Sequence, residues 1–577
     1  MNNTTLKKVL KSLAPQKFLI IASIFLSVLN VIFTLYFPLL IGDAINLIIS
    51  KNNVLLNDVI LLLTKGVITI LGASVSAWLM NIVNNKIAYS TIKDLRSLAI
   101  RKIHNLPLSY LDSHSHGDTL SRVIADVDQF SDGLILGFSQ LFTGIATILG
   151  TLVFMLLINA WIALAVVILT PISLLIAKFI ASRTYSMFQM QTKTRAEQTA
   201  FIDEIISNQK VVKAFSQEEN SQNKFDQINE QLRKHSLSAI FFSSLVNPTT
   251  RFINSIIYAA VALIGALIAS VGGITVGGFT SLLSYVNHYT KPFNEITGII
   301  AELQGSFAAI KRLFDFLDEP EQTPDSDNPN DVEKIVGNFD LTNVSFSYDK
   351  NKELIKNFNL RTKKGQKIAI VGPTGCGKTT VINLLMRFYD VNSGSIELES
   401  VDIRDMSRGH LRSHYGMVLQ DTWLKKGTIA DNIRLGKPEA TDYEVIEAAK
   451  SAHAHSFIMR LPNGYNTLIG EDGGSLSQGQ KQLLCISRIM LCLPPILILD
   501  EATSSIDTMT ETRIQNAFSK LMQGKTSFIV AHRLSTIKNA DIILVMNDGN
   551  IIEQGTHKEL LNKKGFYYNL YNSQFKH

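Results

Sequence analysis

Six long apolar stretches before about residue 310 constrain this chain more than any other feature of its sequence. A helix of about 20 apolar residues crosses the hydrocarbon core of a bilayer, and each stretch is long enough to do so. The sequence therefore predicts an all-α membrane domain of six transmembrane helices over residues 1–316. The six stretches lie near residues 18–41, 57–83, 134–158, 161–181, 241–271 and 276–300.

The loops between these stretches alternate in length and in charge. Polar segments of about 50 to 60 residues separate the second stretch from the third and the fourth from the fifth, and both are rich in Lys and Arg. Because basic residues accumulate in cytoplasmic loops, we expect both long loops and both termini on the cytoplasmic side. Phe201, Ile205 and Val212 recur at helical spacing within the second segment, so the transmembrane helices are expected to continue into the cytosol.

The composition changes after the last apolar stretch. Residues 317–335 are acidic and rich in Pro, which is typical of an exposed linker, and residues 336–577 alternate short apolar strands with helices. The net charge of +6 is too small to indicate a nucleic-acid partner. The cysteines lie only in the second part, at Cys376, Cys485 and Cys492, which favours reduced thiols in the cytosol over a disulfide framework.

One motif in this second part predicts nucleotide binding. The apolar segment 367–371 leads directly into Gly372-Pro-Thr-Gly-Cys-Gly-Lys-Thr-Thr380, which matches G-x-x-x-x-G-K-[ST] in strand–loop–helix order. Backbone amides of such a loop cradle phosphates, Lys378 is expected to reach the β- and γ-phosphates, and the Thr379 hydroxyl to bind Mg²⁺. The fold class predicted is therefore a six-helix membrane domain fused to an α/β P-loop nucleotide-binding domain. The loop residues expected to bind the cofactor are Gly372, Thr374, Gly375, Cys376, Gly377, Lys378, Thr379 and Thr380.

Two further apolar segments end in chemically active side chains. Residues 496–499 precede Asp500, which is expected to hold Mg²⁺, and Glu501, which is expected to polarise the attacking water. A helix cap is the alternative role for this acidic pair. Residues 527–531 precede His532, and the carboxyl edge of a parallel sheet would let this imidazole sense the γ-phosphate.

Together these motifs resemble those of the ATP-binding cassette (ABC) transporters, specifically the bacterial multidrug and lipid exporters that fuse six spans to one cassette. The resemblance covers essentially the whole chain. Its most specific element is Leu476-Ser-Gln-Gly-Gln480, which is similar to the family signature LSGGQ. The resemblance implies a transport ATPase of the bacterial cytoplasmic membrane that uses ATP and Mg²⁺. Its expected partners are membrane lipid and an amphipathic drug, lipid or peptide.

Position by position, the resemblance assigns roles to further residues. Tyr348 matches the aromatic residue that stacks on adenine, and Gln420 matches the glutamine that contacts Mg²⁺ and couples to the membrane domain. Asp507 matches the D-loop aspartate, and turns near residues 110–118 and 215–219 match the coupling helices that rest on cassettes. The catalytic residues are expected to be Glu501, His532 and Gln420, the metal ligands Thr379, Gln420 and Asp500, and the signature residues facing a partner's nucleotide Ser477, Gln478, Gly479 and Gln480.

The signature departs from the family pattern at Gln478, where a glycine would let backbone approach phosphate. This departure, beside an intact Glu501, resembles one subunit of heterodimeric bacterial exporters, whose partner usually keeps the signature and lacks the glutamate. We therefore expect a second, different half-transporter as partner. A homodimer in which Gln478 is neutral variation remains an alternative, and so does a cassette protein that gates a pore or regulates a partner.

The sequence indicates the transported substrate less clearly than it indicates the ATP site. Lys291 and Glu295 lie four residues apart in the last apolar stretch and are spaced to pair with each other. His288, Arg251 and Asn254 are expected near them on the wall of a cavity, because polar groups inside spans tend to line cavities. Structural pairing and substrate recognition both remain open for these residues.

Overall fold

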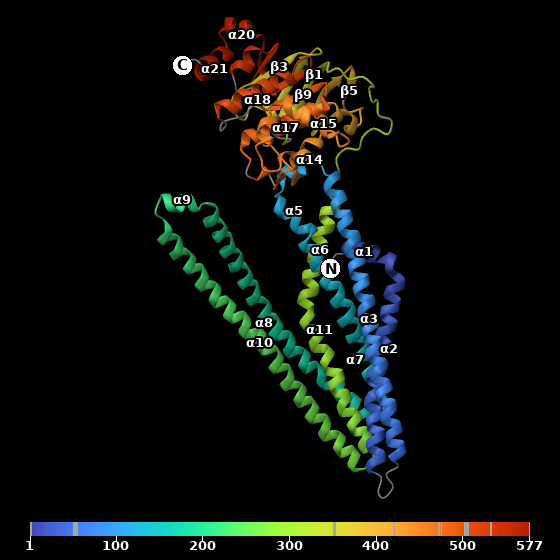
Figure 1. Cartoon of the computed structure of the whole chain (residues 1–577). Coiled ribbons are helices and arrows are strands. Elements are labelled where there is room, and N and C mark those ends of the chain that lie inside the picture. The colour runs from blue at the N-terminus through green and yellow to red at the C-terminus, as the bar shows by residue number, and fades with distance from the viewer. Residues whose placement is uncertain are drawn as a thin grey trace. The chain divides into compact units, whose positions relative to one another are not determined.

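The computed structural model describes residues 3–49, 56–349, 354–419, 422–470, 473–474, 476–500, 507–530 and 534–575 (Figure 1). By the contacts between its residues, the chain divides into two compact units. One comprises Met1–His104 and Ser115–Glu319, and the other Asn105–His114 and Pro320–His577. Within the described residues the first unit is helical, and the strands belong to the second.

Long helices build the first unit, and each of the six predicted apolar stretches falls on one of them. Among the described residues, four helical stretches carry an 18-residue window apolar enough to cross a membrane, and Ala160–Pro171 adds a shorter one. The long segments are α2 (Lys17–Ile49), α3 (Leu56–Asn105), the run of α6 (Ala125–Leu136), η2 (Gly137–Phe142) and α7 (Thr143–Ile158), then α8 (Ala160–Ser207), α10 (Glu218–Ser270) and α11 (Val276–Leu317). The short helices are α1 (Asn3–Leu13), η1 (Ala14–Gln16), α5 (His116–Val123) and α9 (Gln209–Ala214).

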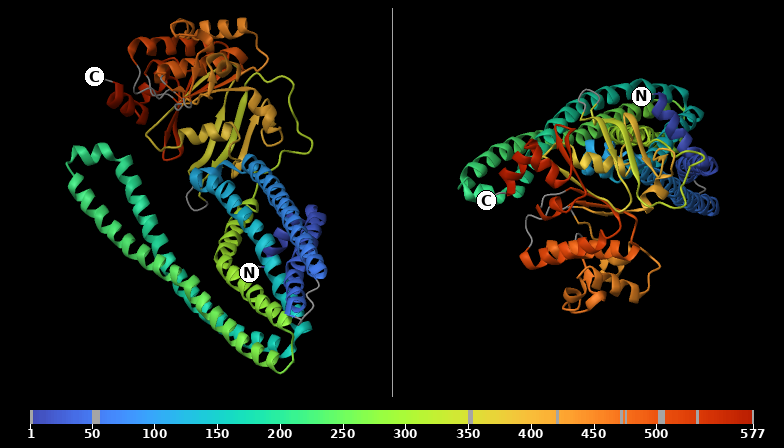
Figure 2. Two further views of the ribbon diagram at one scale, coloured as in Figure 1. Left: turned by 60° about the horizontal axis from the view of Figure 1, so that its bottom comes forward. Right: turned by 90° about the horizontal axis from the view of Figure 1, so that it is seen from above.

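Helices α8 and α10 form a long antiparallel pair joined by α9. Towards α9 this pair separates from the other helices of its unit, whereas α11 packs along α2, α6 and α7 (Figures 1 and 2). The cytoplasmic extension predicted for the second long loop is therefore a continuation of the two membrane helices. The second coupling turn, predicted near residues 215–219, follows α9 directly.

The side chains of the first unit are arranged as in proteins that are surrounded by lipid. Large apolar side chains point outward, including Phe18 at 75% exposure and Trp78 at 64%, while small polar ones lie between helices. The buried Ser23 hydroxyl donates a hydrogen bond of 2.5 Å to the Asn84 side chain, which joins α2 to α3. This arrangement is expected where lipid is as apolar as the helices, since close packing and hydrogen bonds then drive association.

An ion pair fastens α11 to α6 beyond the predicted spans. The Arg312 guanidinium donates to both carboxylate oxygens of Asp126, at 2.5 and 2.9 Å, and the Asp126 side chain is only 7% exposed. The hydrogen bond to Asp126 raises the pKa of Arg312. Lys8 of α1 pairs with Asp318 just after α11, so the N-terminal helix is also held to the end of the last long helix.

Two larger sheets and the two-stranded sheet β7-β8 organise the described part of the second unit, in agreement with the α/β expectation for residues 336–577. The larger sheet has the order β12-β11-β3-β10-β9-β6, with parallel pairing from β11 to β6. The smaller antiparallel sheet has the order β2-β1-β4-β5. The strands are β1 (Phe339–Phe346), β2 (Ile355–Arg361), β3 (Lys367–Val371), β4 (Ser393–Leu398), β5 (Val401–Asp402), β6 (Tyr415–Val418), β7 (Gly427–Thr428), β8 (Leu468–Ile469), β9 (Ile496–Asp500), β10 (Thr526–Val530), β11 (Ile542–Asn547) and β12 (Asn550–Gly555).

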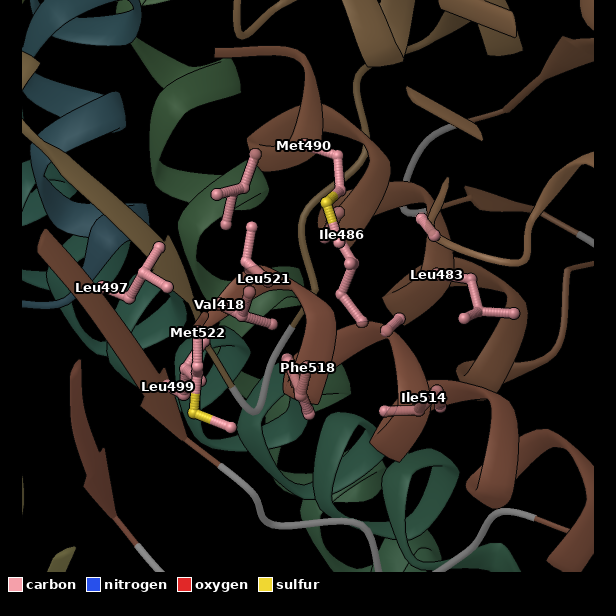
Figure 3. Close-up of a cluster of buried hydrophobic side chains, with 14 of the residues drawn as sticks. Val418, Leu483, Ile486, Met490, Leu497, Leu499, Ile514, Phe518, Leu521 and Met522 are labelled. Carbon is pink, nitrogen blue, oxygen red and sulfur yellow. The ribbon is translucent and has the colours of Figure 1, made fainter. Parts of the chain in front are cut away.

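Helices cover the larger sheet, and its central strands are buried on both faces. Along β9, Leu497 and Leu499 face one hydrophobic cluster while Ile496 and Ile498 face another, which explains the unbroken apolar run in the sequence. Figure 3 shows the first cluster, formed where two helices meet the sheet. The helices are α4 (Leu108–Ser113), α12 (Lys378–Leu385), α13 (Arg408–Ser413), α14 (Ile429–Arg434), α15 (Asp442–Ser451), α16 (His455–Ile458), η3 (Gly464–Asn466), α17 (Gln478–Cys492), α18 (Thr508–Leu521), α19 (Leu534–Lys538), α20 (His557–Lys563) and α21 (Phe566–Phe575).

The predicted linker, residues 317–335, forms no strand and is tied to the second unit by its acidic side chains. Asp325 accepts a hydrogen bond of 2.6 Å from Arg408, and the Asp331 carboxylate accepts one of 2.8 Å from the Ser407 hydroxyl. The sequence property that indicated exposure, a high density of Asp and Glu, is therefore also what holds this segment in place.

Candidate functional site

The glycine-rich loop joins β3 to α12, as the motif predicts. Gly375 and Gly377 have φ of +83° and +100°, a region that side chains disfavour. A Cβ atom at Gly372 would collide with the backbone oxygen of Met546, whereas one at Gly375 would meet nothing within 4 Å. The loop therefore needs glycine for its turn and for close packing, and its outer rim faces open space.

Lys378 is the first residue of α12 and is nearly buried, at 9% exposure. Its Nζ donates hydrogen bonds of 2.9 Å to the backbone oxygens of Gly372 and Pro373, so the ammonium lies over the loop. Thr379 follows it with an exposed side chain, and the amides of the first helical turn have no helical acceptor. A charged amine, free amides and a hydroxyl at one helix start fit a polyphosphate with a hard cation.

The loop Cys376 lies beneath this rim. Its side chain is 4% exposed, and its Sγ lies 4.0 Å from the Lys378 Nζ. Burial raises the pKa of the thiol, more than the nearby ammonium lowers it. The residue therefore packs as a small neutral side chain, and its expected part in nucleotide binding comes through the backbone. Thr374 is exposed on the rim and Thr380 is buried.

The parallel strands bring Asp500 to the same edge of the larger sheet as the glycine-rich loop. β10 pairs with β3 on one side and β9 on the other, with Val530 opposite both Ile370 and Asp500. Asp500 ends β9, where a carboxylate fits the oxygen ligands that Mg²⁺ prefers. Gln420, Glu501 and His532 lie outside the described residues. In the sequence they follow the ends of β6, β9 and β10 by no more than two residues.

Tyr348 lies beside the first turn of α12. Its hydroxyl donates to the Thr380 Oγ1 at 3.3 Å and accepts from the Asn383 Nδ2 at 3.2 Å. The rings of Phe346 and Tyr389 meet it edge-on, with centroids 4.9 and 5.0 Å away. The side chain is nevertheless 51% exposed, so an aromatic base has room to stack on it.

The signature residues form the N-terminus of α17. Ser477 is the N-cap: its hydroxyl accepts from the Gln480 amide at 3.3 Å, and the Gln480 side chain accepts from the Ser477 amide at 3.0 Å. Gln478 occupies the first helical turn with an exposed side chain and a negative φ, while Gly479 is buried. Glutamine at 478 therefore strains no backbone, and its effect is limited to the surface that it presents.

Asp507 caps the next helix, α18, and its carboxylate accepts a hydrogen bond of 2.9 Å from the Thr510 amide. That backbone hydrogen bond lowers the pKa of Asp507. Helices α17 and α18 share the cluster in Figure 3, where Leu483, Ile486 and Phe518 pack over β9. The signature and the D-loop aspartate thus begin two helices anchored in one core.

Comparison with known proteins identifies the chain. The ABC transporter transmembrane region matches residues 20–293, and the ABC transporter ATP-binding domain matches residues 355–504. A fatty acid ABC transporter ATP-binding/permease protein of Mycobacterium bovis is 42% identical over 87% of this chain and 79% of its own length. A putative multidrug export ATP-binding/permease protein of Staphylococcus aureus is 35% identical over 99% and 100%. A bacterial Atm1-family ABC exporter, solved with ATP bound, superposes with a TM-score of 0.81 at 25% identity, covering 98% and 99%.

The chain is an ABC exporter. It is a multi-pass membrane protein with a fused ATP-binding domain, and its enzymatic activity is that of a transport ATPase. The resemblance to ABC exporters that the signature residues 476–480 indicated is therefore confirmed.

One contact in this exporter was not anticipated from its motifs. Helix α4, in the first predicted coupling segment, groups with the ATP-binding unit, and its Asp112 carboxylate accepts a hydrogen bond from the Tyr389 hydroxyl. Burial, and then this carboxylate, raise the pKa of Tyr389. Because Tyr389 also touches Tyr348, only two side chains separate α4 from the P-loop helix. Tyr389 belongs to no motif, so only the folded chain reveals it.

We expect Tyr389→Phe to weaken the coupling between substrate and ATP hydrolysis. The substitution keeps the ring against Tyr348 and removes the hydroxyl that is hydrogen-bonded to Asp112. The contact that holds α4 is therefore weakened, while the nucleotide site is unchanged. Stimulation of ATPase activity by a transported substrate should fall roughly three- to tenfold, with basal activity and the KM for ATP unchanged. Tyr443→Phe, at an exposed tyrosine of α15, is the control.

A double-mutant cycle separates this role from general destabilisation. If the hydrogen bond carries the effect, Tyr389→Phe combined with Asp112→Ala should be no worse than either change alone. Additive losses, or unchanged stimulation in Tyr389→Phe, would contradict the role given to the pair.

Proposed function

We propose that this exporter works as one half of a heterodimer that moves an amphipathic drug, lipid or peptide out of the cytoplasm by alternating access. The observation that carries the heterodimer is Gln478 at the exposed start of α17, together with an intact Glu501 in the sequence. The chain thus keeps the hydrolytic side of one ATP site and contributes an altered signature to the other.

Groups at the edge of the larger sheet that carries the glycine-rich loop bind the nucleotide. Lys378 and the loop amides bind the β- and γ-phosphates, and Tyr348 stacks on adenine. Thr379, Gln420 and Asp500 hold Mg²⁺, which neutralises charge on the phosphates when bound. The described members of this set lie at one edge of the larger sheet or beside it, and this placement supports the assignment.

Hydrolysis requires a water aligned with the γ-phosphate. Glu501 follows β9 in the chain and polarises that water, while His532 follows β10 and donates a hydrogen bond to the γ-phosphate as charge develops. Both assignments rest on sequence order at the edge where β9 and β10 end.

The altered signature acts on the partner's nucleotide. A glycine in the first turn of α17 would let the backbone approach a γ-phosphate, and the Gln478 side chain adds bulk at that surface. Because the capping box of Ser477 and Gln480 is retained, α17 keeps its start and only the presented surface differs. The second ATP site of the dimer is therefore the weaker hydrolytic site.

The helix pair α8–α10 supports the need for a partner half-transporter. Around α9 it carries apolar side chains that nothing in the described residues covers, with Phe215 72%, Ile206 69% and Val211 54% exposed. Apolar side chains at a cytoplasmic tip are stabilised when another protein covers them. By resemblance to the coupling helices, that cover is a cassette of the partner chain.

The proposed location is the cytoplasmic membrane of a bacterium, with both termini and the ATP-binding domain in the cytoplasm. The Lys- and Arg-rich long loops support this orientation. Two relatives bear names that give fatty acids and multiple drugs as their cargo, which supports an amphipathic substrate here.

Native mass spectrometry of the complex, gently extracted from its own host through a tag on this chain, tests the heterodimer. We expect one copy of this chain, 64.0 kDa, with one different polypeptide of similar size. The sequence of that polypeptide should contain an intact signature and lack the glutamate that corresponds to Glu501. A species of two copies of this chain alone would refute the heterodimer and make Gln478 a tolerated variation.

A further inference from the structure

A polar cavity of about 590 Å³ lies between α10 and α11 in the membrane domain. Its α10 wall carries Arg251, Asn254, Ser255 and Tyr258, and its α11 wall includes Asn287 and Lys291. These positions belong to the fifth and sixth stretches that the sequence assigns to the membrane. Arg251 and Asn254 line the cavity as predicted, whereas the described lining does not include His288, which was predicted beside them.

Helical spacing places each set of polar residues on one face. On α10 the residues recur at intervals of three and four, and Asn287 and Lys291 on α11 are four apart. Polar groups within membrane-spanning segments are costly and usually face a cavity that serves substrates or ions. Two facing polar stripes with space between them therefore indicate a binding site for the polar part of a ligand.

The charge of this cavity is positive. Within the part of the chain that the structure describes, no carboxylate lies within 4.0 Å of the exposed Arg251 guanidinium. Lys291 does have the predicted partner: its Nζ lies 3.6 Å from a Glu295 oxygen, with the two side chains 76% and 45% exposed. Because Lys291 also lines the cavity, its ammonium is accessible to a ligand there.

We propose that the cavity binds the acidic headgroup of a single-chain amphiphile, a carboxylate or phosphate, while the tail lies in the hydrocarbon region. Arg251 supplies a planar fork of donors that matches either headgroup, and Lys291 supplies a second cation. The Asn287 amide and the Tyr258 hydroxyl add neutral donors. This assignment rests on the proposed export function and narrows its substrate class. Glu295 is the feature that would instead favour a cationic drug.

The test uses the complete transporter complex in nanodiscs of neutral lipid. The probes are palmitate, hexadecyl phosphate, uncharged hexadecanol and hexadecyltrimethylammonium, which share one tail and differ in headgroup. Binding of each labelled probe and its stimulation of ATP hydrolysis are measured. We expect at least one of the two anions to bind about tenfold more tightly than hexadecanol, and the tighter one identifies the headgroup.

Substitutions of Arg251 and of Glu295 should shift anion binding in opposite directions. Arg251→Gln is expected to weaken binding of the preferred anion about tenfold, with hexadecanol unaffected, and Arg251→Lys should recover most of the loss. Glu295→Gln releases Lys291 and should tighten anion binding roughly threefold. Lys234→Gln is the control, because it removes a cation from α10 17 residues away, about 25 Å along the helix.

The outcomes separate this assignment from the proposed function. Equal binding of anions and hexadecanol, stronger binding of the cation, or no effect of Arg251→Gln would overturn the acidic-headgroup assignment. If only hexadecyltrimethylammonium is bound and transported, the export function stands and the assignment is wrong. If no amphiphile of any charge is bound or moved, the proposed function fails as well.

Discussion

Glu501→Gln is expected to reduce ATP hydrolysis by the transporter at least about 100-fold while ATP still binds. The amide keeps the size of the side chain but cannot accept the proton of the attacking water, and loss of a general base typically costs two to four orders of magnitude. In the proposed heterodimer Glu501 belongs to the ATP site that hydrolyses, so this one substitution should remove most of the ATPase activity of the complex. Phosphate release and binding of labelled ATP are the two measurements.

Glu447→Gln is the matched control for this substitution. Glu447 lies on α15, far from the P-loop in the sequence, and its half-exposed carboxylate pairs with Lys450, so its amide variant should hydrolyse ATP at the wild-type rate. Phosphate release above about a tenth of the wild-type rate in Glu501→Gln would contradict the catalytic role given to this residue.

Lys378→Ala is expected to act before hydrolysis, by weakening the binding of ATP. The ammonium is nearly buried and bonded to two backbone oxygens of the loop, so the substitution removes both the charge that meets the phosphates and two contacts that shape the loop. We expect ATP affinity at this site to fall at least about 100-fold, and the stability without nucleotide to fall by about 1–3 kcal/mol.

The stoichiometry of ATP binding makes this prediction sharper. In the heterodimer, Lys378→Ala should leave one ATP bound per complex, at the partner's own P-loop, whereas a homodimer would lose both. Lys364→Ala, at an exposed lysine just before β3, should change neither number nor affinity. Undiminished affinity at both sites in Lys378→Ala would show that the phosphates do not depend on this ammonium.

Local sequence signals predicted much of this architecture. The six helical segments follow from apolar runs of membrane-spanning length, and the P-loop follows from glycines at positions that need a positive φ, such as Gly375 and Gly377. The parallel sheet follows from short apolar runs buried on both faces, as in β9. Each of these signals is contained within one segment of the chain.

Features that depend on contacts between distant segments could not be predicted in this way. The Asp126–Arg312 pair joins residues 186 positions apart, and Tyr389 meets Asp112 across 277. No periodicity or motif specifies such pairs, because they arise only when separate helices pack. For Gln420, Glu501 and His532, which lie outside the described residues, the roles in catalysis remain predictions from sequence order and family resemblance.

The hydrogen bond between Tyr389 and Asp112 would also let bound cargo affect the binding of ATP. If occupation of the nucleotide site shifts the seat of α4 and thereby changes affinity for cargo, then cargo must change affinity for ATP by the same factor, because linkage between two ligands is reciprocal at equilibrium. A typical coupling of about 1–3 kcal/mol corresponds to a factor of roughly 5–150. If the coupling is positive, bound cargo raises the affinity of the transporter for ATP, and the transporter without cargo binds ATP more weakly by that factor.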